Sequence, residues 1–144
     1  MATYVGINDW LENMLEVADV DGDTFSVALS NTAPGAEDPV PTGDGAGILA
    51  NVTQVAYTYC SARALTLATS AQTAGTYTVG FNGLTLTASG GDVGPFRYVY
   101  IYDDTPSSPA DPLVCYFDYG SSITLATGET LVITLDVSGL FTLA

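Results

Sequence analysis

Residues 94–122 read GPFRYVYIYDDTPSSPADPLVCYFDYGSS and decide the class of fold. The chain has five Phe and nine Tyr, and seven of these fourteen residues fall within this stretch. They lie in two segments, FRYVYIY at 96–102 and LVCYFDY at 113–119, which are rich in aromatic and β-branched residues. Such residues favour strands, so the two segments predict an antiparallel hairpin at the buried centre of a sheet. We therefore expect most of these aromatic side chains in the core.

The rest of the chain predicts one helix followed by further strands. Apolar residues recur at three- and four-residue spacing in INDWLENMLEVA, which predicts an amphipathic helix over 7–18. Short β-rich segments separated by turns follow it, at 24–30, 48–60, 63–91, 121–127, 129–137 and 139–144. This spacing indicates a mainly β fold, an antiparallel β-sandwich or jelly roll with one N-terminal α-helix. Residues 1–144 suit a single domain, with strands and loops over 24–144.

The charge balance narrows the classes of partner. The chain has 16 Asp and Glu residues, no Lys and no His, and its only cations are Arg63 and Arg97, so its formal net charge is −14. Nucleic-acid binding depends largely on Lys and Arg that neutralise phosphates, and anionic membrane surfaces attract the same residues. We therefore expect neither nucleic acid nor membrane as a partner.

The residues needed for common catalytic sites are also missing. Without His, the chain cannot form a Ser-His-Asp or Cys-His nucleophile system, and it lacks the commonest transition-metal ligand. Cys60 and Cys115 are too few for a zinc site, and each lies in an apolar run, which is typical of buried free thiols. A disulfide between them requires that strand pairing bring them together. We expect no enzyme activity and no cofactor.

Acidic residues gather in two places that invite comparison with calcium sites. DVDGD at 19–23 lacks the later ligands of an EF-hand loop, so a turn after the helix is the preferred interpretation. Asp103, Asp104 and Asp111 lie in the connection of the aromatic hairpin. They either chelate Ca²⁺ together with backbone carbonyls or form a solvated loop, and their spacing favours the loop.

Arg97 stands among apolar strand residues and needs a partner. Asp118 on the neighbouring aromatic strand is the first candidate, because a bidentate pair would fix the register of the hairpin. The alternative is that Arg97 is presented to a neighbouring subunit.

Three segments carry a resemblance to a known family. They are DTFSVALSNTAP at 23–34, GPFRYVYIYDDT at 94–105 and YFDYGSSITLATGETLVITLD at 116–136. In this order they resemble a widespread family of small structural proteins of tailed-bacteriophage virions. The resemblance is weaker over the helix and over the loop rich in Pro, Gly and acid at 35–47, and SSPADP lengthens the hairpin connection relative to the family pattern. The shared segments are structural, so no catalytic residue is carried over.

The resemblance implies a virion structural protein made in the cytoplasm of the bacterial host, and the N-terminus lacks the pattern of a signal peptide. The first expectation is a capsid decoration or cement protein that binds the major capsid protein or other virion proteins, as a homo-oligomer with a trimer as the first guess. The alternative is a tail, neck or fibre component that binds another virion protein, a host receptor or a glycan. For partner contacts we expect residues 1–6 with Tyr4, the 35–47 loop with Pro39, and the 103–112 loop with Asp103 and Asp104.

Overall fold

The computed structural model describes residues 2–34 and 47–143. The fold over these ranges is mainly β, with one α-helix, as the sequence predicted. The helical elements are α1 (Asp9–Glu16) and the short 3₁₀ turn η2 (Leu49–Asn51). The strands are β1 (Thr3–Gly6), β2 (Phe25–Ser30), β3 (Leu67–Thr73), β4 (Thr76–Phe81), β5 (Leu84–Thr87), β6 (Val93–Asp103), β7 (Leu113–Leu125), β8 (Thr130–Ile133) and β9 (Phe141–Leu143).

The aromatic hairpin forms the centre of the larger sheet. β6 and β7 pair antiparallel, with Val99 opposite Phe117 and Tyr100 opposite Tyr116. β1 pairs with the outer side of β7 and β2 with the outer side of β6, which gives the order β1-β7-β6-β2. The hairpin predicted from 96–102 and 113–119 is therefore confirmed as the central pair.

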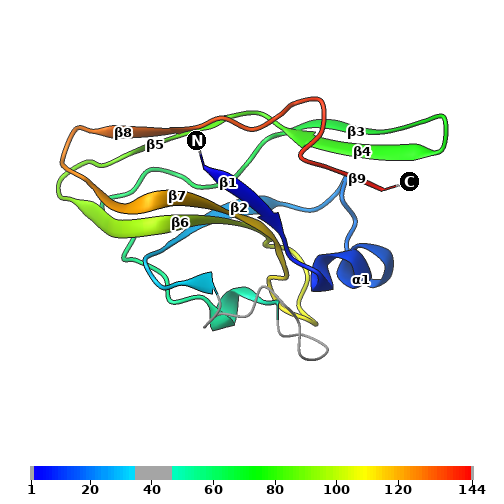
Figure 1. Cartoon of the computed structure of the whole chain (residues 1–144), viewed down its shortest axis with the longest axis horizontal. Coiled ribbons are helices and arrows are strands. Elements are labelled where there is room, and N and C mark those ends of the chain that lie inside the picture. The colour runs from blue at the N-terminus through cyan, green and yellow to red at the C-terminus, as the bar shows by residue number, and fades with distance from the viewer. Residues whose placement is uncertain (1, 35–46, 144) are drawn as a thin grey trace.

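A second layer lies against this sheet. It contains a three-stranded sheet of order β3-β4-β9 and a two-stranded sheet of β5 and β8, all antiparallel. In Figure 1, β5 and β8 lie above β6 and β7 in the left half of the view, and β3, β4 and β9 lie to the right of β5 and β8. The two layers make a sandwich-like arrangement whose core is the space between them.

The two strands of the hairpin are long, and their pairing is irregular. Register shifts interrupt the β6–β7 pairing between Val93 and Tyr98, and β7 continues through Gly120 without a break as far as Leu125. Gly94 has φ +129°, and a Cβ there would lie 3.0 Å from the carbonyl oxygen of Ile123 on the opposite strand. Glycine is needed at this position because the two backbones approach too closely for a side chain. The 121–127 segment, predicted as a separate strand, is thus mostly the continuation of β7.

A cluster of aromatic rings joins the helix to both layers. Trp10 of α1 packs edge-on against Phe25 of β2 and Phe141 of β9, with ring centroids 5.9 and 5.8 Å apart. Phe25 in turn lies 5.0 Å from Phe81 of β4. Phe25 and Phe81 are almost fully buried, and Trp10 is only 5% exposed. Because these rings come from four different elements, their contacts fix the position of the two layers relative to each other.

The helix is shorter than predicted, and its apolar residues divide between two faces. Residues 7–18 were expected to be helical, but α1 spans only Asp9–Glu16. Trp10 faces the core, whereas Leu11 and Leu15 are 55% and 70% exposed. Asp9 and Asn13 occupy the buried face instead, and the Asp9 carboxylate accepts a hydrogen bond from the Gly47 N–H at 2.9 Å. Tertiary contacts, not the apolar stripe alone, therefore set the rotation of the helix.

The segment 48–60 does not form a strand. It contains η2 and isolated bridges, in which Ile48 pairs with Pro112, Gln54 with Ser30 and Cys60 with Ala88. These partners belong to different parts of the fold. The segment therefore crosses between these parts of the fold, and it pairs with them through isolated bridges and not through a continuous strand ladder.

We expect the Phe25→Ala variant to lose on the order of 3–5 kcal/mol of unfolding free energy, because it removes the ring shared by the helix and both layers and leaves a cavity. Chemical denaturation monitored by the fluorescence of Trp10 measures this loss. Leu15→Ala, which truncates an exposed side chain on the helix, is the control and should change stability by no more than about 0.5 kcal/mol. Equal effects of the two variants would contradict the role given to the aromatic cluster.

Candidate functional site

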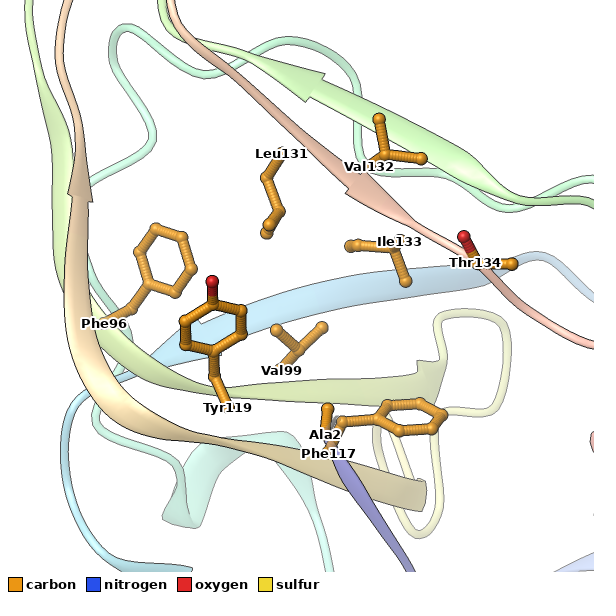
Figure 2. A pocket seen from close by; sticks show the side chains of 9 residues that line it. All are labelled: Ala2, Phe96, Val99, Phe117, Tyr119, Leu131, Val132, Ile133 and Thr134. Atoms are coloured by element: carbon orange, nitrogen blue, oxygen red, sulfur yellow. The ribbon is translucent and has the colours of Figure 1, made fainter.

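An apolar groove opens between the two layers along β8. It forms a pocket of about 420 Å³, lined by Ala2, Phe96, Val99, Phe117, Tyr119, Leu131, Val132, Ile133 and Thr134. Figure 2 shows Phe96, Tyr119 and Val99 rising from the bent hairpin toward Leu131 and Ile133 of β8. The floor of the groove is therefore the central hairpin, and one wall is β8.

A second pocket of about 270 Å³ continues the groove. It shares Phe117 and Thr134 with the first pocket and extends along Leu135, Asp136, Gly139 and Leu140, with Tyr4 on the opposite side. We call the two pockets together the edge groove. It runs between the N-terminal segment at residues 2–4 and the chain at 131–140.

Exposed apolar side chains gather around the edge groove. Val132 is 65% exposed, Tyr119 51% and Tyr4 43%. Single exposed apolar residues are common, but several around one concave apolar site indicate an interaction surface. The edge groove is the candidate functional site.

Tyr4, which the sequence analysis named as a partner contact, lies at this groove. Its ring packs edge-on against Phe117 with centroids 5.5 Å apart. Burial raises the pKa of Tyr4 to about 12, and the Cys115 thiol adds to the rise, so the phenol is neutral at physiological pH. The side chain thus presents an apolar ring at the groove.

Asp103, also named as a partner contact, cannot serve as one because its side chain is completely buried. It ends β6, where the Thr105 N–H donates to its Oδ1 at 3.2 Å. Burial raises the pKa of Asp103 to about 7, the Thr105 hydrogen bond opposes the rise, and the carboxyls of Asp23 and Asp104 add to it. Asp103 Oδ2 is buried and has no hydrogen-bond donor among the described groups. Burial at this position therefore favours the protonated form of Asp103.

The loop acids do not converge into a metal site. Asp104 is exposed, and its Oδ2 lies 3.4 Å from the Ser26 hydroxyl, which donates to it. Burial raises the pKa of Asp111, with the Asp104 charge adding to the rise. Within residues 2–34 and 47–143, no group of three or more acidic, Cys or His side chains has the geometry to hold a metal ion.

Arg97 and Asp118 form the bidentate pair considered from the sequence. Arg97 Nε and Nη2 donate to the two carboxylate oxygens of Asp118 at 2.7 and 2.8 Å, and the Gly120 N–H also donates to Asp118. These bonds lower the pKa of Asp118 and raise that of Arg97. The pair is partly exposed, so it bridges the surface of the hairpin and does not lie inside its core.

The second cation is also engaged within the chain. The guanidinium of Arg63 donates to the carbonyl oxygen of Val27 and lies 3.8 Å from the centre of the Tyr57 ring. Both arginines therefore have internal partners. Neither forms part of the lining of the edge groove.

The cysteines are free thiols in the described chain. Cys115 is fully buried in β7, and burial raises its pKa. Cys60 is partly buried, and its pKa is raised by burial against the opposing charge of Arg63. Raised pKa values disfavour the thiolate form, so neither thiol is activated as a nucleophile.

Sequence reasoning located one end of the groove and missed the rest. It named residues 1–6 and Tyr4, whereas Pro39 and most of the 35–47 loop lie outside the described residues. It did not name Tyr119 or Val132. A signal for Val132 exists, since it is apolar at a strand position whose neighbours on the same face, Thr130 and Thr134, are polar.

No helix within the described ranges is long and apolar enough to cross a membrane. The expectation that membranes are not partners rests on the charge balance given above and stays a prediction.

The raised pKa of Asp103 gives the protein a pH-dependent stability. Between about pH 4 and pH 7 the folded chain holds a proton on Asp103 that the unfolded chain has released, so stability falls as pH rises through this window. We expect Asp103→Asn, which mimics the protonated group, to be more stable than the unmodified chain at pH 8 by on the order of 2 kcal/mol. Near pH 4 the two should converge.

Thermal or urea unfolding at a series of pH values measures this difference. Asp21→Asn, which changes an exposed carboxyl of the nearby turn to an amide, is the matched control and should keep the pH dependence of the unmodified chain. If the stability of Asp103→Asn changes with pH across the window with the same slope as that of the unmodified chain, Asp103 is not the group that holds the proton.

Comparison of this chain with protein-family models, with curated proteins and with solved structures found no match.

Proposed function

We propose that the protein is a structural component of a tailed-bacteriophage virion, and specifically a decoration or cement protein that stabilises the shell by protein–protein contacts. The observation that carries this proposal is the edge groove. An apolar, concave surface bordered by the exposed side chains of Tyr4, Tyr119 and Val132 is suited to binding another protein. The chain that carries this surface is otherwise strongly acidic.

The resemblance supports the class of assembly. The three segments that resemble phage virion proteins contain four strands: 23–34 contains β2, 94–105 contains nearly all of β6, and 116–136 contains most of β7 and all of β8. Three of these strands are neighbours in one sheet, in the order β7-β6-β2. The resemblance therefore follows the part of the chain that builds the sheet and one wall of the groove, as expected for a shared scaffold.

The charge of the chain supports an exterior position. A net charge of −14 keeps the free protein soluble before assembly. On the outer surface of a shell this charge does not face packaged DNA, whereas on the inner surface it would repel it. Binding as a trimer, or around local symmetry axes, would repeat one contact on many equivalent sites.

The alternative is a tail, neck or fibre component. The same groove would then bind a tail protein, a host receptor or a glycan. Exposed Tyr residues are compatible with sugar stacking, so a glycan array separates this alternative from a scaffold that binds protein alone.

Copy number in the virion tests the proposal. The chain is quantified against the major shell protein in purified particles by mass spectrometry, with a known low-copy tail protein as the internal standard. We expect a ratio of the same order as the shell protein. A ratio near that of the tail standard would favour the alternative, and absence from the particles would overturn the structural role.

A further inference from the structure

We propose that the edge groove binds an extended segment of a partner protein, rich in apolar residues and carrying Lys or Arg, which adds as a strand along β8. This inference rests on the proposed function and specifies the chemistry of the contact. It follows from the free strand edges, the side-chain pockets and the distribution of charge.

The first argument is the backbone of β8. Its four residues, Thr130–Ile133, pair with β5 on one side and with no other strand of the described chain. β1 on the opposite side of the groove likewise pairs with β7 alone among the described strands. An unpaired edge presents N–H and C=O groups in a row, and an incoming extended segment can bond to them.

The second argument is the alternation of side chains. Leu131 and Ile133 lie at alternate positions of β8 and point into the groove above Phe96 and Val99, as Figure 2 shows. A strand laid along β8 turns every second side chain toward the same interior. Apolar residues at those positions would fill the pocket of about 420 Å³ and extend the core between the two layers.

The third argument is charge, and it selects the partner. Asp136 lines the second pocket, Glu129 precedes β8, and the net charge is −14. Arg97 is bonded to Asp118, and Arg63 to the Val27 carbonyl, so neither supplies a cation to the groove. A second copy would bring the same excess of carboxylates to this rim. A segment with Lys or Arg at its outward positions is electrostatically complementary instead.

A peptide titration tests the inference. The probe is a synthetic peptide of about nine residues with alternating Val and Lys, long enough to pass along β8 and beyond both of its ends. It is added to the ¹⁵N-labelled full chain, and amide chemical shifts are recorded by NMR. We expect saturable shifts grouped at β8, Phe117 and Tyr119, together with slower hydrogen exchange of β8 amides.

Matched peptides separate strand addition from general attraction. A peptide with Glu in place of Lys should not bind, because its charge opposes that of the rim. A Val–Lys peptide N-methylated at alternate residues keeps its charge but cannot donate to β8, and its Kd should be at least roughly tenfold weaker.

Matched variants of the protein place the binding site. Tyr119→Ala removes a half-exposed ring from the groove and should weaken the binding of the Val–Lys peptide several-fold. Leu15→Ala removes an exposed apolar side chain from α1, away from the groove, and should bind the Val–Lys peptide with the same Kd as the unmodified chain.

Three results would overturn the inference. Shifts confined to the acidic turns at 19–23 and 103–111 would mean charge attraction alone. Concentration-dependent shifts at β8 without peptide would mean that a second copy occupies the groove. Equal binding of the N-methylated peptide would exclude strand addition. Because the titration uses the isolated chain, its failure is distinct from absence of the protein from virions, which would overturn the proposed function.

Discussion

The contacts of Trp10 with Phe25 and Phe141, and of Phe25 with Phe81, hold the two layers together, and the remaining structure depends on them. The rings come from α1, β2, β9 and β4, so a single cluster positions the helix, the central sheet and the second layer. Aromatic side chains bury a large apolar area and favour edge-to-face geometry, which makes such a cluster both stabilising and directional. At this end the sandwich is closed.

Along β8 the same two layers are not closed, and the edge groove results. Register shifts interrupt the pairing of β6 and β7 between Val93 and Tyr98, and Phe96, Val99 and Phe117 line the pocket beside β8. Among the described strands, β8 pairs only with β5 and β1 only with β7. The core of the protein thus continues to the surface at this edge. A contact made there would add to an existing core, and this is the basis for proposing that a short apolar segment binds at this edge.

The charged groups also divide into those bonded or buried within the chain and those left at its surface. Both arginines are bonded within the chain, and burial raises the pKa of Asp103 to about 7, with the carboxyls of Asp23 and Asp104 adding to the rise. What remains for solvent and for partners is a surface of carboxylates interrupted by the apolar groove. A surface of this kind repels anionic partners at a distance and offers a specific apolar contact at one edge.

The sequence by itself determined the elements whose signal is local. Aromatic and β-branched residues at 96–102 and 113–119 were sufficient to predict the central hairpin, and the alternation in 24–30 was sufficient to predict β2, because strand formation depends on neighbouring residues. The bidentate pair of Arg97 and Asp118 could be named in advance because both residues lie on that hairpin.

Only the tertiary structure decided the features made by distant residues. The edge groove joins residues 2–4 to 131–140, and no periodicity in either segment reports that they meet. The burial of Asp103 depends on β2 pairing beside it and on Asp23 from the turn after the helix. The exposure of Leu11 and Leu15 depends on which face of α1 packs against the sheet. In each case the free energy comes from contacts between segments far apart in the chain, and the local sequence does not encode them.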